Sequence, residues 1–292
     1  MKSMPMIIAF LLLRKLTKFT KKLMKKTFLA LCSIAVLLYA CKDEDIINNP
    51  ELTSTQATQD HLFAEQTFCD VGRIVEEGFL ASGVNKSYPK YTIKNQDTSN
   101  PDTLIINYGP ENRPYLNSIL RRGKIIVTFT AKYRDSLAVI TTTFDNYHVN
   151  NNLVQGERVV TNQGRNIEGN MWFTIAVNNA SIVTDNGIIN WNSSRTREWV
   201  SGIDTYGNIA DDRYKITGSA NGIGVNNNSF IMEIIDTLNI DLGCLPSCVI
   251  KSGTAKISPN GYTDRVINYG DSLCDCNFDI TINEINYPIV VN

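Results

Sequence analysis

The feature that most constrains the fold is a long succession of β-branched and aromatic runs, separated by clusters of Gly, Asn and Asp, that begins near Tyr88. Within residues 123–133, for example, Ile125, Val127 and Phe129 share one face, and the polar residues 128, 130 and 132 share the other. Side chains of a strand point alternately to opposite faces, so this alternation predicts a sheet with one buried and one solvated face. Because the separating clusters are short, successive strands are expected to pair as an antiparallel meander.

The same pattern predicts where the strands lie and how they are joined. Turn-forming residues at 185–187, 226–228 and 283–284 support three of the joints, since Asn and Gly tolerate positive φ. A large antiparallel sheet must cover its apolar face, so we expect a sandwich or a curled open barrel. The predicted strands are 90–94, 103–108, 123–133, 137–148, 153–162, 171–177, 180–192, 195–201, 213–225, 228–238, 248–257, 263–269, 276–283 and 285–291.

One amphipathic helix is predicted ahead of the strands, at about 60–80. Asp60 is a suitable N-cap, and Gly83 ends the pattern. Between them, apolar residues recur at helical spacing, namely Ala64, Phe68, Val71, Val75 and Phe79. We expect this stripe to pack on the sheet, which gives a mainly β fold with one N-terminal helix in a single domain over 59–292.

Charge is segregated along the chain. Eight of the 28 Lys and Arg residues lie in the first 26 positions, and no acidic residue precedes Asp43. Without those eight, 20 basic residues face 29 acidic ones, so the chain from Cys41 onward carries a net charge of about −9. A balance this acidic argues against nucleic acid as a partner.

The N-terminal segment has the order of an export signal. Lys25 and Lys26 follow Met24, and an apolar run then covers 28–40. A run of this length is too short for a membrane span, which needs roughly twenty residues. We therefore interpret 1–40 as the signal segment. Within it, we expect that translation really begins at Met24.

The junction Leu38-Tyr39-Ala40-Cys41 resembles the lipobox of bacterial lipoprotein signal peptides. The resemblance implies cleavage before Cys41 and acyl groups on its sulfur, so membrane lipid is an expected partner through that residue. Two attached acyl chains would hold the protein stably. The alternatives are a signal anchor, or ordinary secretion with a chance cysteine.

The polar residues after the lipobox form a second signal. Lys42, Asp43, Glu44 and Asp45 resemble the export signal of Bacteroidota-type surface lipoproteins, which implies a location on the outer face of the outer membrane. The alternative is a solvated charged tether on a protein that faces the periplasm. Residues 41–58 have no apolar periodicity and are predicted to be a flexible, lipidated tether.

Five of the 7 cysteines remain after Cys32 leaves with the signal and Cys41 is acylated. In an exported protein, the C-terminal group of four is expected to form disulfides, paired as Cys248 with Cys274 and Cys244 with Cys276. Tetrahedral zinc coordination by the same four thiolates is the alternative. Cys69 is predicted to be the free thiol.

Candidates for catalysis are few. The only histidines, His61 and His148, limit general-base and zinc-hydrolase mechanisms, and no catalytic or cofactor-binding motif is present. Two other kinds of site were weighed. A glycosidase pair would draw on Glu157, Glu168, Glu198 and Glu233, and a calcium loop would draw on Asp204, Asn208, Asp211 and Asp212. Neither set matches a known spacing, so no catalytic residue, metal or cofactor is predicted.

A candidate ligand face lies on one predicted strand. Trp191, Arg195, Arg197 and Trp199 share one parity, so guanidinium groups and indoles would alternate along one face. Such a face can stack on sugars, or it can pack in the core. The expected function is a non-enzymatic surface lipoprotein that binds or scaffolds a glycan or protein, and the alternative is a polysaccharide-binding or glycan-processing component.

Overall fold

The computed structural model describes residues 55–81, 88–94, 101–115, 118–205, 208–245, 249–271, 273–274 and 277–290. The chain divides into residues 1–49 and residues 50–292, and every described residue lies in the second unit. The signal segment, Cys41 and the export signal Lys42 to Asp45 therefore lie outside the described residues, and the statements about them stay predictions.

The strands form one sheet in which each pairs antiparallel with its neighbours in sequence, from β1 to β13 without a crossover. This is the predicted meander. The strands are β1 (Lys90–Lys94), β2 (Asp102–Tyr115), β3 (Ile119–Phe129), β4 (Val139–Val149), β5 (Asn152–Arg165), β6 (Met171–Thr184), β7 (Gly187–Ser201), β8 (Arg213–Ile223), β9 (Ser229–Asp241), β10 (Ile250–Pro259), β11 (Arg265–Asp271), β12 (Asn277–Ile282) and β13 (Ile285–Val290).

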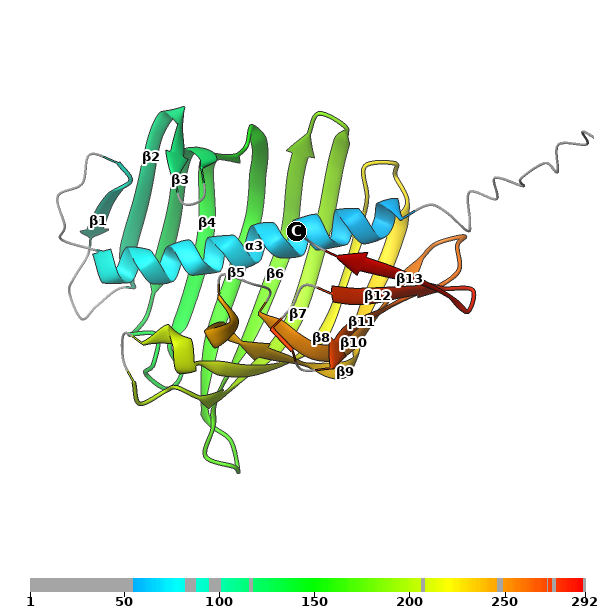
Figure 1. Cartoon of the computed structure of the whole chain (residues 1–292). Helices are drawn as coiled ribbons and strands as arrows, with labels where there is room; N and C mark the ends of the chain where they lie inside the picture. Colours follow the sequence, from blue (N-terminus) through cyan, green and yellow to red (C-terminus); the bar gives the residue numbers. More distant parts are fainter. Residues whose placement is uncertain are drawn as a thin grey trace, which may run out of the picture. The chain divides into compact units, whose positions relative to one another are not determined.

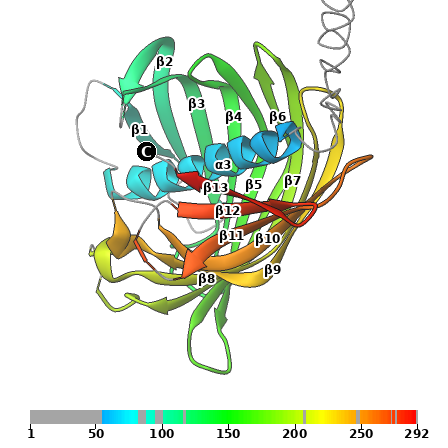
Figure 2. The ribbon, with the colours of Figure 1, turned by 45° about the vertical axis from the view of Figure 1, so that its right-hand side comes forward.

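The sheet curls around the helix α3 (Gln56–Ala81), which crosses the strands on the concave side (Figure 1, Figure 2). β1 and β13 are the two edges, so the sheet is open. Of the two predicted arrangements, the structure has the curled open sheet and not the sandwich. The prediction of a mainly β fold with one N-terminal helix packed on it is confirmed.

The helix stripe behaves as predicted, and the helix start does not. Ala64, Phe68, Val71 and Val75 are buried. Asp60 lies inside α3 and is not its N-cap, because the helix begins one turn earlier at Gln56. The Asp60 carboxylate instead accepts a hydrogen bond from the backbone N–H of Val225, at 3.0 Å, and so ties the helix to the β8–β9 turn.

The region 171–201 contains two strands and not the three predicted. β6 runs through to Thr184, the turn lies at 185–186, and β7 begins at Gly187. Asn179 adopts a positive φ of 51° in a bulge that shifts the β6–β7 register without ending either strand. The bulge interrupts the alternation of apolar and polar residues, and from the sequence this interruption predicts a strand end.

β2 is longer than predicted, and β3 begins and ends four residues earlier than predicted, at Ile119–Phe129 and not at 123–133. Gly109 pairs with Gly123 across the two strands, and both have a φ of 84°. A Cβ atom on Gly123 would lie 2.0 Å from the carbonyl oxygen of Asn146, so the backbones approach closely at this bulge. The strands continue past it, which is why residues 109–122 are mostly strand.

Candidate functional site

The predicted face of β7 exists and is turned to the inside of the molecule. Trp191 contacts His61, Arg195 contacts Glu65 and Arg197 contacts Glu76, and all three partners belong to α3. Trp199 shares their parity, so this face of β7 is turned toward the helix. Trp191 is only 1% exposed and Trp199 only 5% exposed. The structure therefore brings these four residues together as an interior face.

Trp191 is a packing anchor between the sheet and the helix. Its indole Nε1–H donates to Nδ1 of His61 at 3.2 Å, and its ring stacks on Phe68 with centroids 5.7 Å apart. Burial lowers the pKa of His61 to about 4, so the imidazole is neutral near pH 7 and its Nδ1 can accept this hydrogen bond. His61 is thus a core residue of α3.

Three arginines of the concave face meet acidic residues of α3. Arg121 lies 2.7 Å from Asp70, Arg195 lies 2.6 Å from Glu65, and Arg197 lies 3.9 Å from Glu76. A buried guanidinium needs a counter-ion, because removing its charge from water is costly. Glu65 and Glu76 lie on one flank of the apolar stripe of α3, and Asp70 lies on the other flank, so carboxylates from both flanks meet arginines of the sheet.

Arg158, on β5, has no such partner. The residue is only 9% exposed, yet within the described part of the chain its guanidinium has no hydrogen bond and no carboxylate within 4.0 Å. It packs on Gly72 of α3, where a Cβ atom would lie 2.9 Å from its Nη2. Burial lowers the pKa of Arg158, but an arginine keeps its proton at neutral pH. A bare positive charge therefore lies against the helix.

Cys69 shows that solvent reaches this region. The thiol is free and exposed, and it lies one helical turn before Gly72. Surrounding protein atoms raise its pKa to about 12, and the charges of Glu65, Arg158, Arg195 and Arg197 act on it as well. The thiol is therefore crowded by protein on most sides but open to water on one. We call Arg158, Arg195 and Arg197, which reach this stretch of α3 at Gly72, Glu65 and Glu76, the arginine cluster.

The arginine cluster has donors to spare. Nη1 of Arg195 and Nε of Arg197 are buried without a hydrogen-bond partner among the described residues. Arg197 also lies over the rings of Tyr133, Phe173 and Tyr214, at 5.6, 5.2 and 5.0 Å from their centroids. Three guanidinium groups face the two carboxylates of Glu65 and Glu76, so the cluster has one positive charge in excess.

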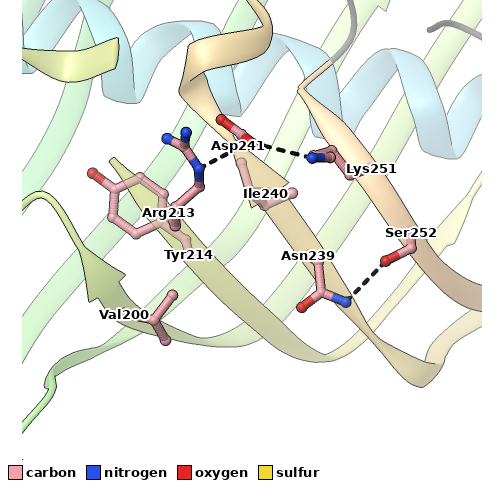
Figure 3. Close-up of a pocket in the computed structure, with 8 residues that line it drawn as sticks. All are labelled: Val200, Arg213, Tyr214, Asn239, Ile240, Asp241, Lys251 and Ser252. Carbon is pink, nitrogen blue, oxygen red and sulfur yellow. Dashed lines mark hydrogen bonds and ion pairs between the residues drawn. The ribbon is translucent and has the colours of Figure 1, made fainter. Parts of the chain in front are cut away.

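A separate pocket of about 430 Å³ lies at one end of β7 to β10 (Figure 3). At its centre, the Asp241 carboxylate lies 2.8 Å from Nε of Arg213 and 3.5 Å from Nζ of Lys251, and it accepts from the Gly243 N–H. Arg213 also donates to the carbonyls of Ala210 and Asp212. These bonds join two short 3₁₀ turns to the sheet, so we interpret the pocket as a structural junction.

The predicted disulfide chemistry is confirmed, and the predicted pairing is wrong. Cys244 is bonded to Cys274, while Cys69 is free; Cys248 and Cys276 lie outside the described residues. Cys244 follows the end of β9 and Cys274 follows the end of β11. Both strands are antiparallel to β10, which lies between them, so β9 and β11 run in the same direction and end on the same side of the sheet. The Cα atoms of the two cysteines lie 5.2 Å apart.

The polar residues considered for catalysis or calcium binding have the following surroundings in the structure. Glu198 accepts from the side chains of Asn166 and Asn170, and these hydrogen bonds lower its pKa. Asp211 accepts from Thr205, and Asp212 accepts from Tyr214. Glu168 is exposed and acts on Glu198, whereas Glu157 lies near Asn178 and Glu233 lies near Lys256. Among the described residues, no group of three or more His, Cys, Asp or Glu could hold a metal ion.

Comparison with known proteins adds no family to this description. No protein family, curated protein or solved structure was found to match the chain. Within the described residues, none of the helices has the length and apolar character needed to cross a membrane. The function of the chain must therefore be inferred from the geometry of the site.

Sequence reasoning missed Arg158 and the line of helix residues, on one flank of the apolar stripe, that the arginine cluster contacts. Arg158 shares parity with Val154 and Val160, so a charged residue on a buried parity was a readable signal. On the helix, Glu65, Cys69, Gly72 and Glu76 recur at steps of three and four beside the apolar stripe. A small residue and two acids on this line mark where arginines from the sheet arrive.

Proposed function

We propose that this chain is a lipid-anchored surface lipoprotein that acts as a non-enzymatic binding module, with the arginine cluster as its ligand-contact site. The lipobox at Leu38 to Cys41 and the charged residues Lys42 to Asp45 support the anchor and the outer-membrane location. The observation that carries the binding role is Arg158, a residue only 9% exposed whose guanidinium has no carboxylate of the described residues within 4.0 Å. It packs on Gly72, in the same stretch of α3 as the solvent-accessible Cys69.

Energetics support this interpretation of Arg158. Burying an unpaired charge costs several kcal/mol, and each buried donor without an acceptor costs roughly 1–3 kcal/mol more. Groups held in such unfavourable surroundings cluster at functional sites. An anionic ligand would supply the missing charge and the missing acceptors at once, because the protein already positions the donors.

The tether suits a module that acts close to the membrane. Fourteen residues lie between Cys41 and Gln56, where the helix begins. A chain of that length spans at most about 50 Å when fully extended, at roughly 3.3–3.6 Å per residue. The anchored domain would therefore meet ligands within a short distance of the lipid surface.

The glycan alternative gains no support from the site. Stacking on a sugar requires an accessible aromatic face, whereas Trp191 and Trp199 are buried. The proposed binding site is therefore the arginine cluster alone.

Two measurements test the proposal. Cys41→Ser should release the protein from membranes after a carbonate wash, because acyl chains on Cys41 are its proposed attachment; sedimentation of the variant with membranes would place the anchor elsewhere. For binding, the thermal midpoint of the wild-type protein should rise with small organic anions and not with their neutral analogues. An equal response to both would contradict a site built on guanidinium groups.

A further inference from the structure

We infer that the arginine cluster binds a monoanionic carboxylate with an apolar body, with the carboxylate on Arg158 and the body along the apolar side chains beside it. The inference rests on the proposed binding role and names the chemical class of the ligand. The free donors, the charge balance and the apolar neighbours of the cluster support it.

The head group follows from the donors. A guanidinium presents a planar fork of N–H groups that matches the two oxygens of a carboxylate or the oxygens of a phosphate. Among the described residues, the Arg158 guanidinium has no hydrogen bond and no ion pair. Arg195 and Arg197 each have one buried nitrogen without an acceptor. These donors come from two strands and reach α3 at Glu65, Gly72 and Glu76, the same stretch of the helix that carries the exposed Cys69.

The charge of the ligand follows from the balance at the site. Three arginines face Glu65 and Glu76, so one negative charge completes the balance. The Cys69 thiol adds none near pH 7, because its pKa is raised to about 12. A phosphate monoester with two charges would leave an excess negative charge next to two glutamates, and like charges this close repel. A carboxylate satisfies both the geometry and the charge.

The apolar body follows from the neighbours of the cluster. Ile175 pairs directly with Arg195 across β6 and β7, on the concave face. Tyr269 of β11 lies near Glu65 and Arg195, and its ring packs against Phe278 with centroids 6.0 Å apart. All three side chains are only partly buried although they face the core. They provide apolar surface for a ligand whose charged end is on Arg158.

The test uses the full lipidated protein in lipid nanodiscs, with empty nanodiscs as the blank for ligand that enters lipid. Octanoate, octanol and inorganic phosphate are titrated by calorimetry. We expect octanoate to bind at one site per protein, at least tenfold more tightly than octanol or phosphate. Arg158→Met should weaken octanoate binding at least tenfold. Arg165→Met, which removes an exposed arginine from the same strand, should leave it unchanged.

A second variant keeps the test decisive if Arg158→Met does not fold. Glu76 is largely exposed, and Glu76→Gln removes a negative charge beside the cluster. This variant should bind octanoate about three- to tenfold more tightly, and unchanged or weaker binding would overturn the inference.

The remaining outcomes separate the two proposals. Binding of octanoate that does not depend on Arg158 overturns the inference. Binding of phosphate that depends on Arg158, without octanoate binding, overturns the carboxylate class but leaves an anion-binding module. Absence of binding by all three probes counts against the binding function itself.

Discussion

Replacing Arg158 with methionine should make the protein more stable, although most substitutions of buried residues do the opposite. Arg158 is about nine-tenths buried, and no carboxylate of the described residues lies within 4.0 Å of its guanidinium. Methionine has a similar length and no charge, so Arg158→Met removes the cost of the unpaired charge and keeps most of the packing against Gly72. The same change would remove the proposed ligand contact.

The size of the effect can be worked out from this environment. Glu65 and Glu76 act on Arg158 only from a distance, so little attraction is lost with the charge. Replacing buried charges by apolar side chains of similar volume has stabilised proteins by about 1–4 kcal/mol. For a domain of this size, each kcal/mol shifts the thermal midpoint by roughly 2–4 °C. We expect a rise of about 2–16 °C and a matching increase in the urea midpoint.

Arg121→Met is the matched control, since it places the same substitution on the same face. Arg121 has an ion pair with Asp70 at 2.7 Å and donates to the Tyr147 hydroxyl at 2.8 Å. Asp70 is partly exposed and keeps Arg73 at 2.6 Å, so the expected loss is moderate, about 1–3 kcal/mol. If both variants lowered the urea midpoint equally, Arg158 would have a partner in solution and the reasoning would be wrong.

Three further predictions concern pH, the disulfide and the helix. Because burial lowers the pKa of His61 to about 4 from 6.5, the unfolded chain takes up a proton before the folded one; stability should fall as the pH drops from 6.5 towards 4, by about 2–3 kcal/mol at pH 4.5. Urea midpoints should trace this loss, and His61→Gln should flatten it; an equal slope in the variant would assign the loss to other groups. Cys244→Ser should cost roughly 3–4 kcal/mol by opening a loop of 30 residues, and peptide mapping that finds Cys244 paired elsewhere would refute the bond. Val71→Asp places a charge on a fully buried position of α3 and should cost several kcal/mol, so a thermal midpoint within about two degrees of wild type would show that the helix is not packed on the core.

The strands and the helix were predictable because their signals are local. Alternation of apolar and polar residues indicated most strands, and the spacing of Phe68, Val71 and Val75 indicated the buried side of the helix. The errors came where a bulge interrupts the alternation, as at Asn179 and Gly123. A bulge changes which face a residue occupies but keeps the strand paired, and only the neighbouring strand reveals that.

The candidate site was only half predictable. Shared parity placed Arg195 and Arg197 on one face with Trp191, and this grouping is present in the structure. Whether that face would lie inside or outside depended on the position of α3. Arg158 carried a signal in its parity, but the lack of a counter-ion could not be read from its neighbours in sequence.

The sequence by itself determined an antiparallel meander, one helix with an apolar stripe and an odd number of cysteines, because each depends on residues a few positions apart. The tertiary structure decided the partners. Glu65 reaches Arg195 and His61 reaches Trp191 across 130 positions of the chain, and Cys244 finds Cys274 because β10 lies between β9 and β11. Such pairs depend on how far the sheet curls around α3. That curvature leaves Arg158 against Gly72, with no acidic side chain of the described residues within 4.0 Å of its guanidinium.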